Sequence, residues 1–305
     1  MTAPAIQADN LSKTYGTTRA VVDLSLRVEP GQVFAFLGPN GAGKSTTIRM
    51  LLDLQRPTSG SASILGSDVH GQSVDVHRRI GYLPGDLELY PRMTGQRHID
   101  WFARARGGVD RAYVDELVKR FDVVLNRPVR ALSKGNRQKI GLVIAVMHRP
   151  ELLILDEPTS GLDPLMQNEF ERLVRETVAD GRTVFLSSHE LDEVQRLADR
   201  VAIIKQGHLV ANDTVAGLAR SMPRRIEARF TAPVDQSLFA SLDGVQVAEC
   251  ADGRIALDVS GPIAPVLRVI ADRDPVDLVS RPASLDELFL DLYRTPSTEE
   301  HADAH

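Results

Sequence analysis

The sequence predicts an α/β protein with a parallel-sheet core, a helical insert and a small C-terminal α+β domain. Short apolar runs rich in β-branched residues alternate with longer helical patterns over the first two thirds of the chain, which is typical of a parallel sheet covered by helices on both faces. A glycine-rich segment joins one such strand to a helix. After about residue 222, short strands of alternating polar and apolar residues indicate a second domain.

The elements of the first domain follow from these patterns. Buried strands are predicted at Val33–Leu37, Glu151–Leu155, Thr183–Leu186 and Val201–Ile204. Core helices are predicted near residues 44–54, 165–179 and 190–198. Three further helices interrupt the alternation, at Gln96–Ala105, Arg111–Phe121 and Lys134–Met147. We expect these three to form an insert over about residues 86–148, inside a first domain that spans residues 1–222.

The C-terminal segment predicts a ferredoxin-like domain over residues 223–295. Strands are expected at Arg225–Phe230, Val245–Glu249, Arg254–Val259 and Val276–Val279, with a hairpin turn at Asp252-Gly253. Helices are expected over residues 262–272 and 284–293. The order fits a β-α-β-β-α-β domain, and residues 296–305 are expected to form a tail.

Composition narrows the classes of function. The chain has 305 residues, a net charge of −5 and one cysteine, Cys250. This charge argues against an extended basic surface, so no nucleic acid is expected as a partner. One cysteine allows no internal disulfide. The start of the chain does not resemble a secretory signal, and no apolar stretch is long enough to span a bilayer. We therefore expect a cytoplasmic protein that reaches a membrane only through another subunit.

The segment from Gly38 to Ser45 matches the pattern G-x-x-x-x-G-K-[ST] between a predicted strand and a predicted helix. Its glycines let backbone N–H groups turn toward phosphate oxygens, and the helix start adds partial positive charge. Lys44 suits the β- and γ-phosphates of ATP, and the Ser45 hydroxyl suits Mg²⁺. A turn without a ligand is the alternative, which the full pattern disfavours. The expected ATP-binding residues here are Gly38, Pro39, Asn40, Gly41, Ala42, Gly43, Lys44, Ser45 and Thr46.

Two acids follow the apolar strand at residues 151–155. Asp156 would reach the rim of the sheet, where ligands bind in such folds, and is suited to hold Mg²⁺. Glu157 can face the attacking water as a general base. A helix cap or a turn before Pro158 is the alternative for each acid, and the phosphate loop makes it weaker for Asp156 than for Glu157.

Several further motifs resemble those of ABC ATPases, a family of P-loop NTPases, in the order in which that family carries them. The segment Leu132-Ser133-Lys134-Gly135-Asn136 is similar to the signature motif L-S-G-G-Q, with Lys134 and Asn136 as departures. Ser133 alone predicts only a helix N-cap. The segment Ser160-Gly161-Leu162-Asp163 resembles the D-loop. His189 resembles the switch histidine, and Tyr15 the aromatic residue that stacks on adenine. The resemblance covers about residues 4–220.

One position departs from the family pattern. The family has a glutamine after Ile80–Pro84, where this chain has Gly85 followed by Asp86. Glycine has no side chain that could reach Mg²⁺ or the attacking water. Either Asp86 or Glu88 takes over this contact, or the contact is lost.

The resemblance implies an ATPase that works as a homodimer or with a paired ABC ATPase subunit. Ser133 and Gly135 of one chain would close over ATP held by Lys44 of the other, with Glu157 orienting water and His189 contacting the γ-phosphate. It also implies a separate multi-spanning membrane permease. The candidate surface for that partner is the stretch Leu83–Tyr90 and the helix with Trp101 and Phe102, for which core packing is the alternative.

Three details resemble the drug- and antibiotic-export branch: the Ser133–Gly141 run, the variant glutamine loop and the segment Ala283–Tyr293. An importer motor, a soluble ABC ATPase outside transport and an ATP-binding subunit without hydrolysis are the alternatives. The chain has one cassette and no long coiled coil, which disfavours the soluble class. Glu157 and His189 disfavour the non-hydrolysing one.

Overall fold

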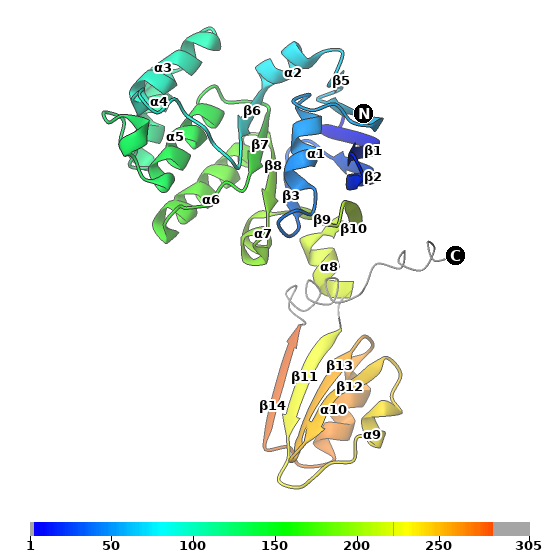
Figure 1. Ribbon diagram of the computed structural model, residues 1–305. Coiled ribbons are helices and arrows are strands. Elements are labelled where there is room, and N and C mark those ends of the chain that lie inside the picture. Colours follow the sequence, from blue (N-terminus) through cyan, green and yellow to red (C-terminus); the bar gives the residue numbers. More distant parts are fainter. Residues whose placement is uncertain (1–2, 222, 283–305) are drawn as a thin grey trace. The chain divides into compact units, whose positions relative to one another are not determined.

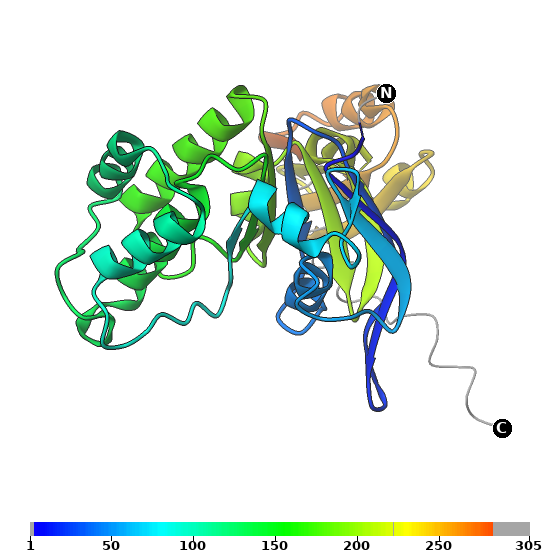
Figure 2. The same cartoon turned by 90° about the horizontal axis from the view of Figure 1, so that it is seen from above.

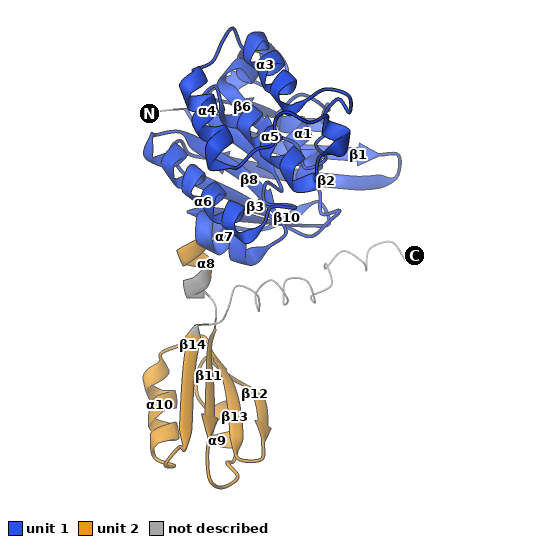
Figure 3. Ribbon diagram, turned by 90° about the vertical axis from the view of Figure 1, so that its left-hand side faces the viewer, with its two compact units in different colours: residues 1–213 blue, residues 214–305 orange. Residues whose placement is uncertain are grey.

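The computed structural model describes residues 3–221 and 223–282. The chain folds as two compact units, Met1–Asp213 and Thr214–His305 (Figure 3). Within the part that the model describes, no helix has both the length and the apolar character needed to cross a bilayer. The predicted helix over residues 284–293 and the predicted tail over residues 296–305 lie outside the described residues.

A six-stranded sheet forms the centre of the first unit. Its strand order is β10-β9-β3-β8-β7-β6, and the four pairings from β9 to β6 are all parallel. The strands are β3 (Val33–Leu37), β6 (Ile80–Leu83), β7 (Leu152–Asp156), β8 (Thr183–Ser188), β9 (Arg200–Lys205) and β10 (His208–Thr214). Every residue of β3, β7 and β8 is buried, as expected for central strands covered on both faces. The predicted parallel-sheet core is confirmed.

A second, antiparallel sheet has the order β2-β1-β4-β5. Its strands are β1 (Ile6–Tyr15), β2 (Thr18–Val28), β4 (Ser59–Ile64) and β5 (Ser67–Asp68). The sequence analysis did not predict this sheet. Strand β1 changes register against β2 at three places, which breaks the alternation of polar and apolar residues by which a strand is recognised.

Helices fill the space around both sheets. They are α1 (Lys44–Leu51), α2 (Ser73–Arg79), α3 (Gly95–Ala105), α4 (Arg111–Arg120), the 3₁₀ turn η1 (Val129–Ala131), α5 (Lys134–Val146), α6 (Pro164–Ala179) and α7 (Leu191–Leu197). Ile48 and Leu51 of α1 belong to one hydrophobic core with residues of both sheets. Helices α3, α4 and α5 gather on the side of the unit away from the β1–β2 hairpin (Figures 1 and 2). This group is the predicted helical insert.

The second unit contains α8 (Val215–Ser221), β11 (Arg224–Arg229), α9 (Ser237–Ala240), β12 (Val245–Ala251), β13 (Arg254–Val259), α10 (Ile263–Ala271) and β14 (Asp277–Pro282). Its sheet has the order β12-β13-β11-β14, with antiparallel pairings. From β11 to β14 the order is the predicted β-α-β-β-α-β. Phe239 of α9 and Val266 of α10 are buried in a core of this unit's own.

Candidate active site

The glycine-rich loop leaves the buried strand β3 and enters α1. Gly41 and Gly43 have φ angles of 81° and 109°, in the left-handed region that favours glycine. A Cβ atom on Gly38 would lie 2.5 Å from the carbonyl oxygen of Ile204, so that position has no room for a side chain. Within residues 3–221, none of the described hydrogen bonds is donated by the N–H groups of Asn40, Gly41 or Gly43. These donors are therefore available to phosphate oxygens.

Lys44 is almost fully buried at the base of this loop, with 5% of its surface exposed. Its Nζ atom donates to the carbonyl oxygens of Gly38, at 2.6 Å, and Pro39, at 3.0 Å. The lysine thus braces the loop from inside. These two partners are neutral carbonyls, and the charged partner of Lys44 in this chain is the carboxylate of Glu157, whose Oε1 lies 3.4 Å from Nζ.

Asp156 and Ser45 form the candidate Mg²⁺ site. Asp156 is buried at the carboxyl end of β7, and its Oδ1 accepts a hydrogen bond of 2.5 Å from Ser187 Oγ. Its other oxygen, Oδ2, accepts none of the described hydrogen bonds. The described residues contain no group of three or more His, Cys, Asp or Glu side chains placed to hold a metal ion. A carboxylate and a serine hydroxyl are hard oxygen ligands, so the residues fit an Mg²⁺ ion that takes its remaining ligands from ATP phosphates and water.

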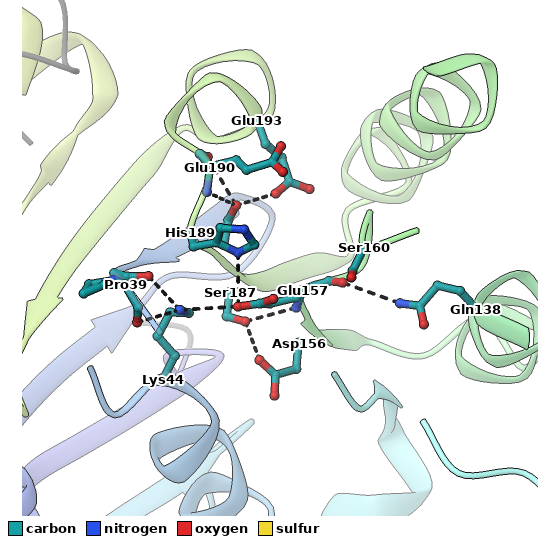
Figure 4. Close-up of polar contacts among 12 residues, drawn as sticks. Pro39, Lys44, Gln138, Asp156, Glu157, Ser160, Ser187, His189, Glu190 and Glu193 are labelled. Atoms are coloured by element: carbon teal, nitrogen blue, oxygen red, sulfur yellow. Dashed lines mark hydrogen bonds and ion pairs between the residues drawn. The ribbon is translucent and has the colours of Figure 1, made fainter. Parts of the chain in front are cut away.

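Glu157 lies between Lys44 and His189 (Figure 4). Its Oε1 atom is 3.4 Å from Lys44 Nζ and 3.3 Å from His189 Nδ1. The backbone of Glu157 has a φ angle of 49°, an uncommon conformation for a non-glycine residue. Its N–H donates to the carbonyl and hydroxyl oxygens of Ser187, which hold it there. The residues predicted to act as the base, the phosphate-binding lysine and the switch histidine therefore converge on one point.

The signature segment opens α5. The Ser133 hydroxyl accepts a hydrogen bond from the N–H of Asn136 and caps the helix. Lys134 Nζ donates to Ser160 Oγ at 3.0 Å, which ties the signature segment to the D-loop of the same chain. A Cβ atom on Gly135 would lie 2.5 Å from the carbonyl oxygen of Gly161, so the two segments also touch through their backbones.

The side chain of Asn136, which departs from the family's signature motif, bonds to the backbone of Val124. Its Oδ1 accepts from the N–H of Val124 at 2.8 Å, and its Nδ2 donates to the Val124 carbonyl at 3.0 Å. Leu132 is also buried. Leu132 and Asn136 thus support the signature segment through buried contacts, and Ser133, Lys134 and Gly135 lie between them in the sequence.

Two separate cavities adjoin these motifs. One of about 610 Å³ is lined by Ser133, Lys134 and Gly135, together with Gly161 and Asp163 of the D-loop. The other, of about 190 Å³, is lined by Glu157, His189 and the D-loop from Thr159 to Leu162. Gly161 borders both. The structure therefore brings Lys44, Asp156, Glu157 and His189 together in one chain but places Ser133 on a different surface, against the other side of the D-loop.

Gly85, at the departure from the family pattern, lies directly against Asp156. A Cβ atom there would be 3.3 Å from Asp156 Oδ2. Asp86 is exposed. Burial, followed by the negative charge of Asp156, raises the pKa of Tyr82 to about 12. The phenol therefore stays protonated beside the acids of this loop.

Tyr15 stands at the tip of the β1–β2 hairpin with 44% of its surface exposed. Its hydroxyl accepts a hydrogen bond from Gln55 Nε2, and Lys13 Nζ lies 5.3 Å from the centre of the ring. An exposed ring with its edge fixed in this way can stack on a planar base.

Sequence reasoning missed some residues of the site. Gln138 of α5, for which no role was predicted, is buried and donates to the carbonyl of Pro158 at 3.2 Å. Ser187 and Ser188 end strand β8, and Glu193 is buried behind His189. The signal that could have found the serines is a polar pair at the carboxyl end of an apolar strand.

The chain is similar to a protein family, to two named relatives and to a solved structure. The family model described as ABC transporter matches residues 21–160. The chain is 35% identical to the daunorubicin/doxorubicin resistance ATP-binding protein DrrA of Streptomyces peucetius, over 98% of this chain and 96% of that protein. It is also 35% identical to the bacitracin transport ATP-binding protein BcrA of Enterococcus faecalis, over 70% of each. A solved structure of an ATP-binding subunit of an ABC transporter superposes with a TM-score of 0.64 at 31% identity, covering 71% of this chain and 92% of that one.

Proposed function

The chain belongs to the ABC transporter family of ATP-binding proteins, and from this premise we propose how its residues turn over ATP and which transporter they serve. It is an ATP-hydrolysing motor subunit, similar over almost its whole length to a protein named for drug resistance. The observation that carries the proposal is the convergence of Lys44, Glu157 and His189 on one point at the rim of a parallel sheet.

In the proposed reaction, the available N–H groups of the glycine-rich loop hold the β- and γ-phosphates of ATP, and Lys44 adds its charge. Tyr15 stacks on adenine. Mg²⁺, held by Ser45 and Asp156, would neutralise charge on the phosphates. Glu157 orients a water molecule and takes its proton as the water oxygen bonds to the γ-phosphorus. The bond from that phosphorus to the bridging oxygen breaks, which yields ADP and phosphate, and His189 steadies the γ-phosphate oxygens.

The second half of the site comes from another copy or a paired subunit. Ser133 and Gly135 lie apart from Lys44 in one chain, on the cavity across the D-loop. We propose that they close over the nucleotide bound to the partner's loop. ATP then binds the closed pair more tightly than the open one, which is the requirement for a ligand that drives a conformational change.

As the two paired ATP-binding subunits close and open, they act on a separate membrane permease. Binding to this permease places the chain at the cytoplasmic face of the membrane. The candidate contact is the aromatic surface of the insert, because Tyr90 is 66% exposed and Trp101 53% exposed. This exposure disfavours core packing for Trp101, whereas Phe102 is half-buried, and exposed aromatic residues are enriched at protein interfaces. The transported compounds are proposed to be drugs, antibiotics or other hydrophobic molecules.

The test is to purify the full chain from its native membrane and measure ATP hydrolysis. We expect a multi-spanning membrane protein to co-purify and turnover to require Mg²⁺. Glu157→Gln should abolish turnover and leave ATP binding intact, since the amide keeps the shape of the base but cannot accept the proton. Full activity of this variant would contradict the role of Glu157. Co-purification with ribosomes or nucleic acid instead would contradict transport.

A further inference from the structure

Behind the switch histidine lies a buried acid that the reaction above does not use. Glu193, on α7, is 3% exposed and lines the 190 Å³ cavity that also borders Glu157, His189 and the D-loop. Its Oε2 lies 2.5 Å from Ser188 Oγ, and its Oε1 is buried without a hydrogen-bond partner among the described residues (Figure 4). A buried polar atom without a partner is rare and calls for an explanation.

A proton on Oε2 would leave Oε1 as an uncharged carbonyl oxygen, for which burial without a partner costs less than for a carboxylate. Ser188 Oγ accepts from the N–H of Glu190 at 3.0 Å, and it also lies 3.2 Å from the Glu190 carbonyl oxygen and 2.5 Å from Glu193 Oε2. One hydroxyl proton cannot serve both of these oxygens fully. If Glu193 is protonated, its Oε2–H donates to Ser188 Oγ, and Ser188 donates to the Glu190 carbonyl. An ionised Glu193 would instead place negative charge on a buried Oε1 that has no partner by hydrogen-bond geometry among the described residues and only the influence of the Thr159 hydroxyl to offset it, which is costly.

The surroundings shift the pKa of Glu193 in the same direction. Burial is the largest cause that raises the pKa of Glu193, and the charge of Glu190 adds to it. The hydroxyls of Ser188 and Thr159 and the charge of Arg196 act in the opposite direction, but the net shift is upward from the ordinary value of 4.5. Across the cavity stand His189 and the carboxylate of Glu157. A second negative charge beside Glu157 would also repel a γ-phosphate.

We propose that Glu193 acts as an uncharged carboxylic acid that fixes the switch loop and so positions His189 against Glu157. Glu193 contacts Ser188, and Ser188 in turn contacts the backbone of Glu190. These two residues precede and follow His189 in the chain. Glu193 touches neither nucleotide nor water in this account, so it is a positioning residue. The inference rests on the proposed function, because its effect is seen in the hydrolysis step.

The experiment compares Glu193→Gln, Glu193→Ala and the matched control Asp192→Asn in the full chain. Asp192 is an exposed acid in the first turn of the same helix. The glutamine amide has the shape of a neutral carboxylic acid and can donate to Ser188, so the kcat of Glu193→Gln near pH 7 should stay within about twofold of wild type. The kcat of Glu193→Ala should fall about tenfold or more, because catalytic groups that are out of position react slowly. KM for ATP should change little in either, and Asp192→Asn should behave as wild type.

The pH profile separates positioning from simple structural support. As pH rises through the folded pKa of Glu193, the wild-type carboxyl ionises and kcat should fall. The glutamine variant cannot ionise there, so the ratio of its kcat to that of wild type should increase with pH. Infrared difference spectra should show the C=O stretch of a protonated acid at neutral pH that disappears in Glu193→Gln and remains in Asp192→Asn.

The outcomes that overturn the inference are distinct from failure of the proposed function. If wild type does not hydrolyse ATP at all, the proposed function is wrong. If wild type is active but Glu193→Gln is as slow as Glu193→Ala, the residue works as an anion. A kcat ratio that does not change with pH, or an unchanged kcat in Glu193→Ala, also contradicts the proposal. Should the alanine variant fail to fold, the glutamine profile and the infrared band still decide.

Discussion

At the scale of the residue, neutral groups of the chain help to hold the charged side chains of the site in place. Lys44 is braced by two carbonyl oxygens, and Asp156 by one hydroxyl. Glu157 is held in an uncommon backbone conformation by Ser187. Strained backbone of this kind persists at functional sites when surrounding contacts over-determine it. Contacts between single side chains and the backbone also lead to two predictions about stability.

Asn136 supports the signature segment by satisfying both backbone groups of Val124. Asn136→Ala leaves that N–H and C=O without their partner, so we expect a loss of roughly 1–3 kcal/mol in the free energy of unfolding. Asn168→Ala, at an exposed position of α6, is the matched control and should stay within about 0.5 kcal/mol of wild type. Chemical denaturation measures both. Equal losses in the two variants would contradict the role of Asn136.

His148 should make the protein sensitive to mild acid. Burial, followed by the positive charge of Arg106, lowers its pKa from 6.5 to about 4. Its Nε2 lies 3.0 Å from the Ile80 carbonyl, and its Nδ1 is buried without a partner among the described residues. The unfolded chain therefore takes up the proton first, and stability is lost as pH falls from 6.5 toward 4. Melting temperatures should fall less steeply over this range in His148→Gln. Identical slopes would contradict the assignment.

At the scale of the element, the D-loop is the link between the two halves of the site. It borders both the cavity at Glu157 and the cavity at Ser133. Lys134, where the family has glycine, bonds to Ser160, and its stem lies close to Gly161. The departure from the family pattern thus adds a tether between the signature segment and the D-loop.

Removal of that tether should affect turnover more than stability. Lys134→Ala loses one exposed hydrogen bond, so its melting temperature should change little. Its kcat should fall about threefold to tenfold, because the D-loop is no longer bonded to the signature segment. Lys139→Ala is the matched control, because Lys139 lines the same cavity and none of the described hydrogen bonds joins it to the D-loop. Equal kcat values for the two variants would show that only the charge of the cavity matters.

The elements also show what a sequence can and cannot predict. Strands β3, β7 and β8 were predictable because each is a buried apolar run. The sheet of β1, β2, β4 and β5 was not, since irregular register hides its alternation. The pattern of motifs identified Lys44 and Asp156, but it could not show that Asn136 faces inward or that Glu193 lies behind His189. Such placements depend on contacts between segments far apart in the chain.

At the scale of the whole molecule, each of the two units has its own hydrophobic core. All the site residues described above lie in the first unit. Ser133 lines the cavity on one side of the D-loop, and Lys44 contacts Glu157, which lines the cavity on the other. We propose that a second copy or a paired subunit completes the site. Pairing of two chains changes the molecular mass of the particle in solution, so it can be tested without measuring the rate of ATP hydrolysis.

The most direct measurement is the mass of the Glu157→Gln chain in solution with Mg²⁺ and ATP. The account predicts about twice the 33.5 kDa of one chain with ATP and a single chain without it. Ser133→Asp keeps a helix cap but brings negative charge against the partner's phosphate. When it is added to Glu157→Gln, the mass with ATP should fall to that of one chain, and that chain should still bind ATP. Ser133→Asn, an uncharged cap of the same size, should retain the pair. A chain that binds ATP and stays at 33.5 kDa, or that pairs equally well with either substitution at Ser133, would contradict the claim.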